Sequence, residues 1–435
     1  MNNLVSFIGI FILMALAWLF SADRKVVNWR VVIWGTALQL VFGVFVFIVP
    51  VGAKLFLFIN DIVVKVLDSA TAGTKFLLGR LALPPGGTNE AGETSLGFIL
   101  AFQALPTIVF FASLMSVLYY VGLMPRLIGF FSLIFTRLMR ISGAESLCTA
   151  GNIFVGIESA TTIRPYLERM TKSELMTILT AGMATIASSV MALYVFILQP
   201  KFPTIAGHLV SASILSAPAA VVMSKLLMPE TGSPETLGMH VRPHYGKEST
   251  LMEAVINGAN AGVRLVVGIA ALLLALLGIV ALADLVLAVA GSAVGDMLGV
   301  RLDLSLKAVF AYLFYPFTLV IGVPLADAWQ IAGILGERPI VTEVKSYQDL
   351  AVLVSSNALK DTRSAVLAVY ALCGFAHIPS LAIFVGGTAA LAPSRAGDIS
   401  RVGIRALAAA TLACLMTAAV AGTFYTGGSL LYNYR

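Results

Sequence analysis

The chain has 435 residues, of which 59% are apolar and only 11% are charged, and its mean hydropathy is +0.95. Soluble domains usually carry about 25% charged residues, so this composition excludes an ordinary soluble protein and predicts a polytopic membrane protein. The net charge of +6 does not indicate a nucleic-acid partner, because the Lys and Arg residues stand in short connections between apolar stretches. The three cysteines stand in apolar surroundings without metal or disulfide spacing, so no bound cofactor is expected.

Eight apolar stretches are long enough to cross a bilayer as helices. We expect these spans near residues 4–22, 31–51, 95–121, 174–198, 207–228, 262–290, 363–391 and 403–426. Three further stretches, 54–81, 125–141 and 304–320, have the amphipathic pattern of helices that lie at the membrane surface. The alternative for 125–141 is a ninth span.

Two further apolar regions, 144–170 and 323–354, each carry an acidic residue and a turn signal near the middle. A lipid-facing span does not tolerate both features, so we expect two re-entrant hairpins. The spans that follow them, 174–198 and 363–391, are interrupted by polar residues and, in the second, by Pro379. We therefore expect two discontinuous helices, and repeated discontinuous helices are typical of secondary transporters.

Positive residues follow every odd-numbered span, which fixes an expected orientation. The four groups are Arg24, Lys25 and Arg30; Arg126, Arg137 and Arg140; Lys225, Arg242 and Lys247; and Arg395, Arg401 and Arg405. All of them fall on one side if eight spans alternate, and that side should be the cytoplasm, so both termini should face outward.

The polar, Pro- and Gly-rich segment 229–250 then becomes a cytoplasmic linker between two halves. Its His240 and His244 are expected to be solvated loop residues rather than metal ligands. The expected segments are 1–94, with two spans and an amphipathic helix; 95–228, the first half; the linker; and 251–435, the second half.

Oxygen-bearing residues gather in the first half. Asn152 and Val155 are three residues apart, and Ser188 and Ser189 are adjacent in the next helix. Amide and hydroxyl oxygens together with freed backbone carbonyls suit a small cation. Packing between membrane helices also favours small and hydroxyl residues and explains this pattern equally well.

Glu158 and Glu343 lie within the two expected hairpins, and an intramembrane carboxylate is a candidate functional residue. For Glu158 the alternative is a salt bridge with Arg164. Close to Glu343 stands Lys345, which either pairs with it or extends to the membrane surface.

His377 and Ser380 lie where the second discontinuous helix is expected to open. His377 can hydrogen-bond a ligand hydroxyl or titrate near neutral pH, and the alternative is that it satisfies a freed backbone carbonyl. Phe375 can stack on a planar ligand or serve as a core residue.

The polar residues cluster at one depth, which favours a transporter. A ligand-gated receptor or channel would need a polar stripe along several spans, and a membrane enzyme would need a nucleophile with a base or a metal cluster. The sequence contains neither pattern.

Several runs resemble the concentrative nucleoside transporters. They are ALCGFAHIPSLAIFVGG with the segment that follows it, NIFVG, RPYLERMTKSEL and GVPLADAWQIAGILG. The resemblance extends in order from about residue 96 to residue 422. It implies an all-α membrane protein with eight transmembrane helices, two re-entrant hairpins, two discontinuous helices and an inverted-repeat transport domain in a homotrimer.

The resemblance also implies sodium- or proton-driven uptake of nucleosides or nucleoside-like compounds across a bacterial inner membrane by alternating access. Its sodium positions fall on Asn152, Val155, Ser188, Ser189 and Val190. Its ribose-binding positions fall on Glu343, His377 and Ser380, and its ring-packing position falls on Phe375.

The first hairpin departs from the family pattern. Where the family reads Gly-Gln-Thr/Ser-Glu-Ala-Pro, this chain places Ile157, Glu158 and Ser159 at the three positions that contact the nucleobase in the family. His377 likewise stands where the family has Asn. The cation-binding positions thus match the family, whereas several ligand-binding positions carry other residues. The alternative substrate is therefore a different polar metabolite.

Overall fold

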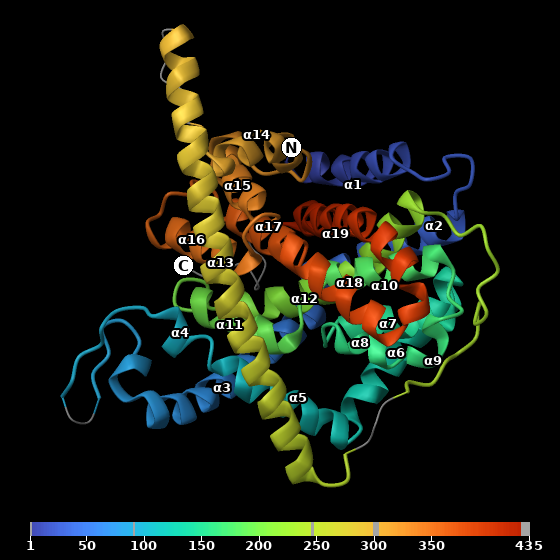
Figure 1. Ribbon diagram of the computed structural model, residues 1–435, viewed down its shortest axis with the longest axis horizontal. Helices are drawn as coiled ribbons and strands as arrows, with labels where there is room; N and C mark the ends of the chain where they lie inside the picture. Colours follow the sequence, from blue (N-terminus) through green and yellow to red (C-terminus); the bar gives the residue numbers. More distant parts are fainter. Residues whose placement is uncertain (1, 90–91, 245–247, 299–303, 428–435) are drawn as a thin grey trace.

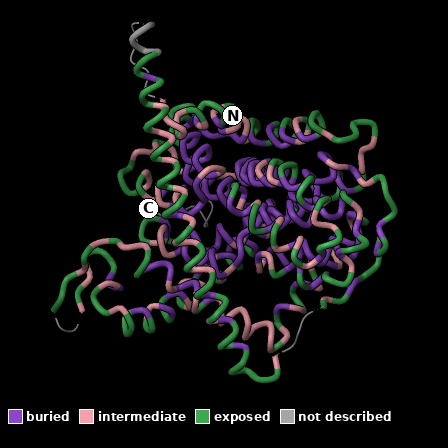
Figure 2. The backbone as a smooth tube through the Cα atoms, in the orientation of Figure 1, coloured by how far each residue is buried: buried purple, intermediate pink, exposed green. Residues whose placement is uncertain are grey.

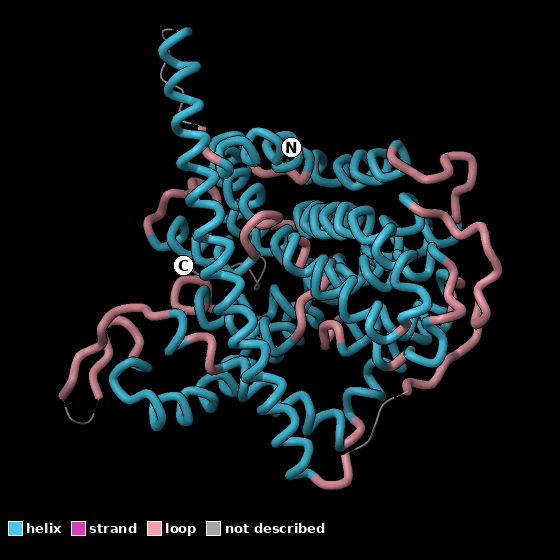
Figure 3. The backbone as a smooth tube through the Cα atoms, viewed as in Figure 1, coloured by secondary structure: helices cyan, strands magenta, loops and turns pink. Residues whose placement is uncertain are grey.

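A computed structural model describes residues 2–89, 92–244, 248–298 and 304–427. Lys247, one of the expected cytoplasmic charges, lies outside these ranges. Every regular element within them is a helix, apart from two isolated bridges, Thr88–Thr94 and Ser142–Leu237 (Figure 3). The prediction of an all-helical membrane-type fold is confirmed at this level.

The N-terminal helices lie around the outside of the molecule in Figure 1, from the top to the bottom of the view. They are α1 (Asn2–Leu19), α2 (Trp29–Phe47), α3 (Pro50–Leu78), the short 3₁₀ helix η1 (Gly79–Ala82), α4 (Leu100–Gln103), α5 (Thr107–Tyr120) and α6 (Leu123–Met139). Several predicted boundaries were wrong: the helix of the sixth span begins at Leu251 rather than 262, and that of the eighth begins at Ala396 rather than 403. Two further boundaries have a clear local cause. The second span ends at Phe47 rather than 51 because Pro50 begins α3. The third begins at Leu100 rather than 95 because Gly97, at φ +94°, turns the chain before it.

The remaining helices contribute most of the buried interior, which is drawn purple in Figure 2. Those of the first half are α7 (Gly143–Asn152), α8 (Glu158–Thr161), α9 (Arg164–Leu167), α10 (Lys172–Ala184), α11 (Ser188–Leu198) and α12 (Ile205–Leu227). Those of the second half are α14 (Leu306–Val320), α15 (Leu325–Glu337), α16 (Glu343–Ser355), α17 (Thr362–Leu372), α18 (Ile378–Leu391), the 3₁₀ helix η2 (Pro393–Arg395) and α19 (Ala396–Phe424).

Seven helical stretches among the described residues are long and apolar enough to cross a membrane. The expected seventh span, 363–391, consists of α17 and α18, and each of these alone falls short of that length. The sequence predicted an interruption here, and the helix is indeed divided by residues 373–377. The number of membrane crossings stays a prediction.

The two helix breaks touch each other. A Cβ added to Gly374, in the break between α17 and α18, would lie 2.5 Å from the Cys414 sulfur and 2.9 Å from the Ala184 carbonyl oxygen. Ala184 is the last residue of α10, directly before the other break. Only glycine allows this approach, so Gly374 fixes the two breaks side by side.

One long helix, α13 (Leu251–Leu298), crosses the face of the molecule and extends beyond it (Figure 1). It packs on α5 through Gly258 and Gly262, where an added Cβ would come within 2.6 Å of a Cα atom of α5. Small residues four apart allow such close helix contact in membranes. The remainder of α13 is mostly exposed and apolar (Figure 2).

A buried lysine joins three central helices. Lys225 on α12 is 2% exposed, and its Nζ lies 2.7 Å from Glu145 Oε1 on α7 and 2.9 Å from Ser173 Oγ on α10. Glu145 also completes the capping box that begins α7. The lysine therefore neutralises a carboxylate that the fold needs at this helix start.

We predict that Lys225→Met lowers the thermal unfolding midpoint of the purified protein by at least about 5 °C. The change leaves Glu145 charged, buried and without its cation, which costs about 3–5 kcal/mol. The control is Arg169→Ala, because the ion pair of Arg169 with Glu235 is exposed and should matter little. Equal midpoints for the two variants would contradict this account of Lys225.

Candidate functional site

A small cavity of ≈ 120 Å³ lies where five segments meet. They are the turn between α7 and α8 and the turn between α15 and α16, called here the tips of the first and second hairpins; the break between α10 and α11; the break between α17 and α18; and α13. The first hairpin contributes Ile157 and Glu158, and the second contributes Thr342 and Glu343. The breaks and the helices after them contribute Ser189, Val190, Phe375, His377, Ser380, Ile383 and Phe384. Residues more than 180 positions apart along the chain thus share one cavity.

Glu343 is the buried carboxylate of this cavity. It begins α16, is 3% exposed, and accepts a hydrogen bond from the Tyr194 hydroxyl on α11. Its other oxygen, Oε2, lies 2.6 Å from His377 Nε2. A buried carboxylate is tolerated when donors surround it, and these two groups are such donors.

His377 is the N-cap of α18 and is held in a defined tautomer. Its Nδ1 accepts a hydrogen bond of 3.2 Å from the Ser380 backbone amide. A ring nitrogen that accepts carries no proton, so the proton of a neutral imidazole resides on Nε2, which lies 2.6 Å from Glu343 Oε2 and 2.9 Å from Ser380 Oγ. His377 is therefore in contact with a carboxylate and a hydroxyl, and among the described residues its ring has no backbone-carbonyl partner.

Much of the remaining wall of the cavity is apolar. Ile157 packs on α18, where a Cβ added to Gly387 would lie 2.2 Å from its Cδ1. Phe384 packs on α10 in the same way, 2.3 Å from a Cβ added to Gly182. Phe375 is half-buried and meets the His377 ring edge to face at 6.4 Å. The cavity thus combines two carboxylates, Glu343 and Glu158, and a few hydroxyls with large apolar surfaces.

The oxygen-bearing residues of the first half gather at the neighbouring break. Phe154, in the first hairpin, accepts a hydrogen bond of 2.9 Å through its carbonyl from the Ser188 amide at the start of α11. Among the described residues the Asn152 side-chain oxygen accepts one hydrogen bond, of 2.8 Å, from Ser159 Oγ. An amide oxygen has two lone pairs, so one remains for a cation. The hydroxyls of Ser188 and Ser189 form no hydrogen bond within the described part of the chain.

Ser159 does not face the cavity as expected. It is buried, and its hydroxyl is bonded to Asn152 instead. The sequence pattern failed here because Ser159 lies on the turn of α8 that faces back to α7, where a Cβ added to Gly151 would be 3.1 Å from the Ser159 Cβ. The structure thus groups Ser159 with the candidate cation ligands.

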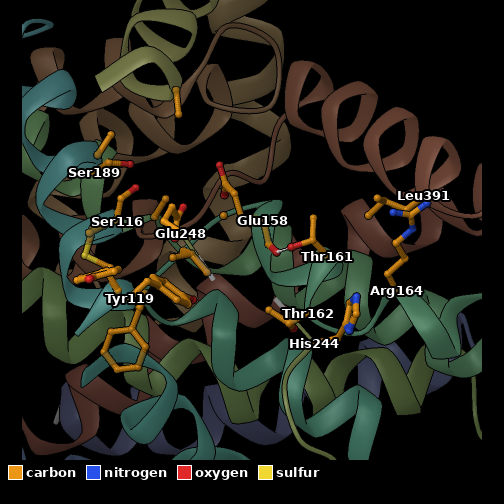
Figure 4. A pocket seen from close by; sticks show the side chains of 18 residues that line it. Ser116, Tyr119, Glu158, Thr161, Thr162, Arg164, Ser189, His244, Glu248 and Leu391 are labelled. Atoms are coloured by element: carbon orange, nitrogen blue, oxygen red, sulfur yellow. Dashed lines mark hydrogen bonds between the residues drawn. The ribbon is translucent and has the colours of Figure 1, made fainter. Parts of the chain in front are cut away.

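A larger cavity of ≈ 400 Å³ adjoins the first, and Glu158 lines both. Figure 4 shows Glu158 between a side formed by Ser116 and Tyr119 and a side formed by Arg164 and His244. Among the described residues no ion pair joins Glu158 to Arg164, so Glu158 is available at the junction of the two cavities.

Lys345 does not pair with Glu343. Its ammonium group contacts Asp349 and Glu337, on the side of the second hairpin away from the cavity. The charge of Glu343 is therefore balanced within the site by hydrogen-bond donors and not by this lysine.

Sequence reasoning missed Tyr194. Its ring stacks on Tyr347 of α16, with centroids 4.4 Å apart, while its hydroxyl reaches Glu343. A tyrosine within an apolar run is a weak hint of a buried polar partner, since its hydroxyl needs one when buried. The identity of that partner, 149 residues away, is given only by the fold.

Three family models match this chain in succession. "Na+ dependent nucleoside transporter N-terminus" matches residues 8–81, "Nucleoside recognition" matches 101–201, and "Na+ dependent nucleoside transporter C-terminus" matches 208–422. Together they extend over most of the chain and over every residue that lines the two cavities.

Similar proteins and structures agree with these models. An "Uncharacterized transporter" of Haemophilus influenzae is 36% identical over 98% of both chains. "Solute carrier family 28 member 3" of Eptatretus stoutii is 36% identical over 98% of this chain, which spans only 61% of that relative's length. The solved structure of CNTnw "in an inward-facing substrate-bound state" is 34% identical over 98% of both chains, with a TM-score of 0.85.

We predict that Tyr194→Phe destabilises the purified protein by about 1.5–3 kcal/mol, because it removes a hydrogen bond to a buried charged group. Tyr347→Phe is the matched control. Its hydroxyl donates to the neutral Val369 carbonyl, so its loss should cost about 0.5–1.5 kcal/mol. Thermal unfolding of both variants measures the difference, and a larger loss for Tyr347→Phe would contradict the assignment.

Proposed function

The chain belongs to the concentrative nucleoside transporter family, and from this we propose that it is a cation-coupled secondary active carrier of nucleosides or nucleoside-like compounds. The observation that carries the proposal is the cavity in which both hairpins and both helix breaks surround Glu343. Such a site between repeats, built from discontinuous helices, is the arrangement used by alternating-access carriers.

In the proposed mode of binding, Glu343 accepts hydrogen bonds from the sugar hydroxyls of the ligand. A carboxylate offers about four lone pairs, and Tyr194 and His377 use two of them. Ser380 keeps His377 oriented, so these two side chains position the carboxylate. Phe375 and Ile157 then pack on the flat, less polar part of the ligand, and Glu158 contacts its polar edge.

We further propose that sodium binds beside the first hairpin, with the proton as the alternative coupling ion. Its ligands would be the side-chain oxygens of Asn152, Ser188 and Ser189 with the carbonyls of Val155 and Val190. Ser159, through its bond to Asn152, would orient the amide oxygen toward the ion.

The larger cavity supports the proposal that the ligand leaves on the side of the linker, residues 229–250. His244 and Glu248 belong to the linker or to its end, and both line this cavity together with Glu158. The distribution of Lys and Arg assigns the linker to the cytoplasm. The described conformation is therefore proposed to open inward, with Glu158 at the boundary between binding cavity and exit.

The finer architecture belongs to the same proposal. It comprises eight spans, two re-entrant hairpins and an inverted repeat, in a bacterial inner membrane with both termini in the periplasm. The exposed apolar side chains along α13 support a homotrimer whose subunits meet there, in contact with membrane lipids elsewhere. Large exposed apolar surfaces mark protein or lipid contacts.

The second candidate is a carrier of a different polar metabolite. It is favoured by Ile157, which packs on Gly387 and presents no amide where the family has Gln. A thermal-shift screen of purified protein against nucleosides, nucleobases and sugars, with and without sodium, separates the two candidates. A ligand that binds only the folded state raises the unfolding midpoint.

We predict that Glu343→Gln lowers nucleoside uptake at least about tenfold, which corresponds to about 1.4 kcal/mol. The change keeps the side-chain volume but removes charge-assisted hydrogen bonds to the ligand. The control is Glu235→Gln, an exposed acid remote from the cavity. Uptake by the Glu343 variant at the wild-type rate would refute the assignment.

We predict that replacing sodium by choline at fixed pH abolishes accumulation, and that Asn152→Ala raises the sodium concentration needed for half-maximal uptake. The reason is the loss of one oxygen ligand. Asn257→Ala, at an exposed position on α13, should leave this concentration unchanged. If uptake does not depend on sodium and is abolished by a protonophore, the coupling ion is the proton.

A further inference from the structure

The two hairpins are equivalent residue by residue across their tips. Residues 151–158 read GNIFVGIE and residues 336–343 read GERPIVTE, without a gap. In both, the first helix ends at the second residue of this run, and the next helix begins at the final Glu. Ser188 begins α11 and donates to the Phe154 carbonyl, as Ile378 begins α18 and donates to the Pro339 carbonyl.

The repeats differ in charge at two neighbouring positions of this run, and at the first of them Asn152 corresponds to Glu337. At the second position, Ile153 of the first hairpin corresponds to Arg338 of the second hairpin. Both side chains are buried, and Arg338 is 1% exposed, the largest fully buried side chain among the described residues. A charged side chain at this depth is costly unless its surroundings compensate for it.

The surroundings of Arg338 are carbonyls and thiols. Its guanidinium donates a hydrogen bond of 2.6 Å to the Ala371 carbonyl, one residue before the end of α17, and it faces the thiols of Cys373 and Cys414. No ion pair to an acid forms among the described residues, and Nε has no hydrogen-bond partner there. The adjacent Glu337 pairs with Lys307 instead.

The compensating charge is therefore the C-terminal end of α17. The last carbonyls of a helix carry a partial negative charge that favours a cation. In the first repeat the corresponding position of the hairpin carries the neutral Ile153, so this position supplies no charge to the end of α10. A cation at that break has to come from solution.

We propose that Arg338 is a tethered cation that occupies the second helix break, so that transport requires a free cation only at the first. The inference rests on the proposed cation-coupled function and extends it to the residue that replaces a second ion. Arg338 acts by holding the break of α17 and the tip of the second hairpin together, and so positions Glu343 five residues later.

The transport test compares Arg338→Lys, which keeps the charge, with Arg338→Met, which keeps the length. Sodium-driven nucleoside uptake into proteoliposomes should stay within about threefold of wild type for the Lys variant and fall at least about tenfold for the Met variant. Equal impairment of the two variants would overturn the proposal, because the charge would then be irrelevant.

A second measurement does not depend on transport. Arg338→Ala opens a space beside the Ala371 carbonyl, and millimolar methylguanidinium should fill it and raise the unfolding midpoint of the full-length protein by at least about 3 °C. Wild type and the matched cavity variant Ile153→Ala should shift by less than about 1 °C. No excess shift for Arg338→Ala would overturn the tethered cation.

The two measurements separate the two proposals. If the wild-type protein takes up no nucleoside, the proposed function fails while the methylguanidinium comparison still decides the role of Arg338. If wild-type uptake is sodium-driven and the Met variant matches it, only the tethered cation fails.

Discussion

A broken helix within a bilayer leaves backbone groups that lipid cannot satisfy. In this protein each break is satisfied by the tip of the hairpin that faces it, through the carbonyls of Phe154 and Pro339. These are main-chain bonds, so they fix each hairpin to its break whatever the nearby side chains are. The ligand cavity, the oxygens beside Asn152 and the buried Arg338 all lie within a few residues of these two bonds.

The two breaks are also joined to each other. Cys414 of α19 points its thiol at the carbonyls of both Ala184 and Cys373, and Gly374 allows the chains to approach. Tyr194 of α11 then reaches across to Glu343 of the second hairpin. Coupling between two sites requires an element whose state both sites bias, and this shared framework provides one.

The sequence allowed the helical class and both helix breaks to be predicted, because acidic residues and Pro are rare within apolar runs, where they are energetically costly. Glu343 and His377 were found by this signal. Tyr194 and Arg338 were missed because their importance lies in partners that are distant along the chain, Glu343 and the Ala371 carbonyl. Ser159 was misplaced because α8 has only four residues, and in so short a helix the spacing along the sequence does not show which side chains face the cavity.

The repeat also explains why its two equivalent carboxylates differ. Counting from the starts of α11 and α18, His377 corresponds to Ala187 and Tyr194 corresponds to Phe384. Glu343 therefore has two donors, whereas the same two positions opposite Glu158 carry a methyl group and a phenyl ring. Glu343 is buried and held, and Glu158 is exposed at the junction of the cavities. The same position in the repeat thus yields a fixed carboxylate on one side and, on the other, a carboxylate whose oxygens are free for whatever enters the cavity.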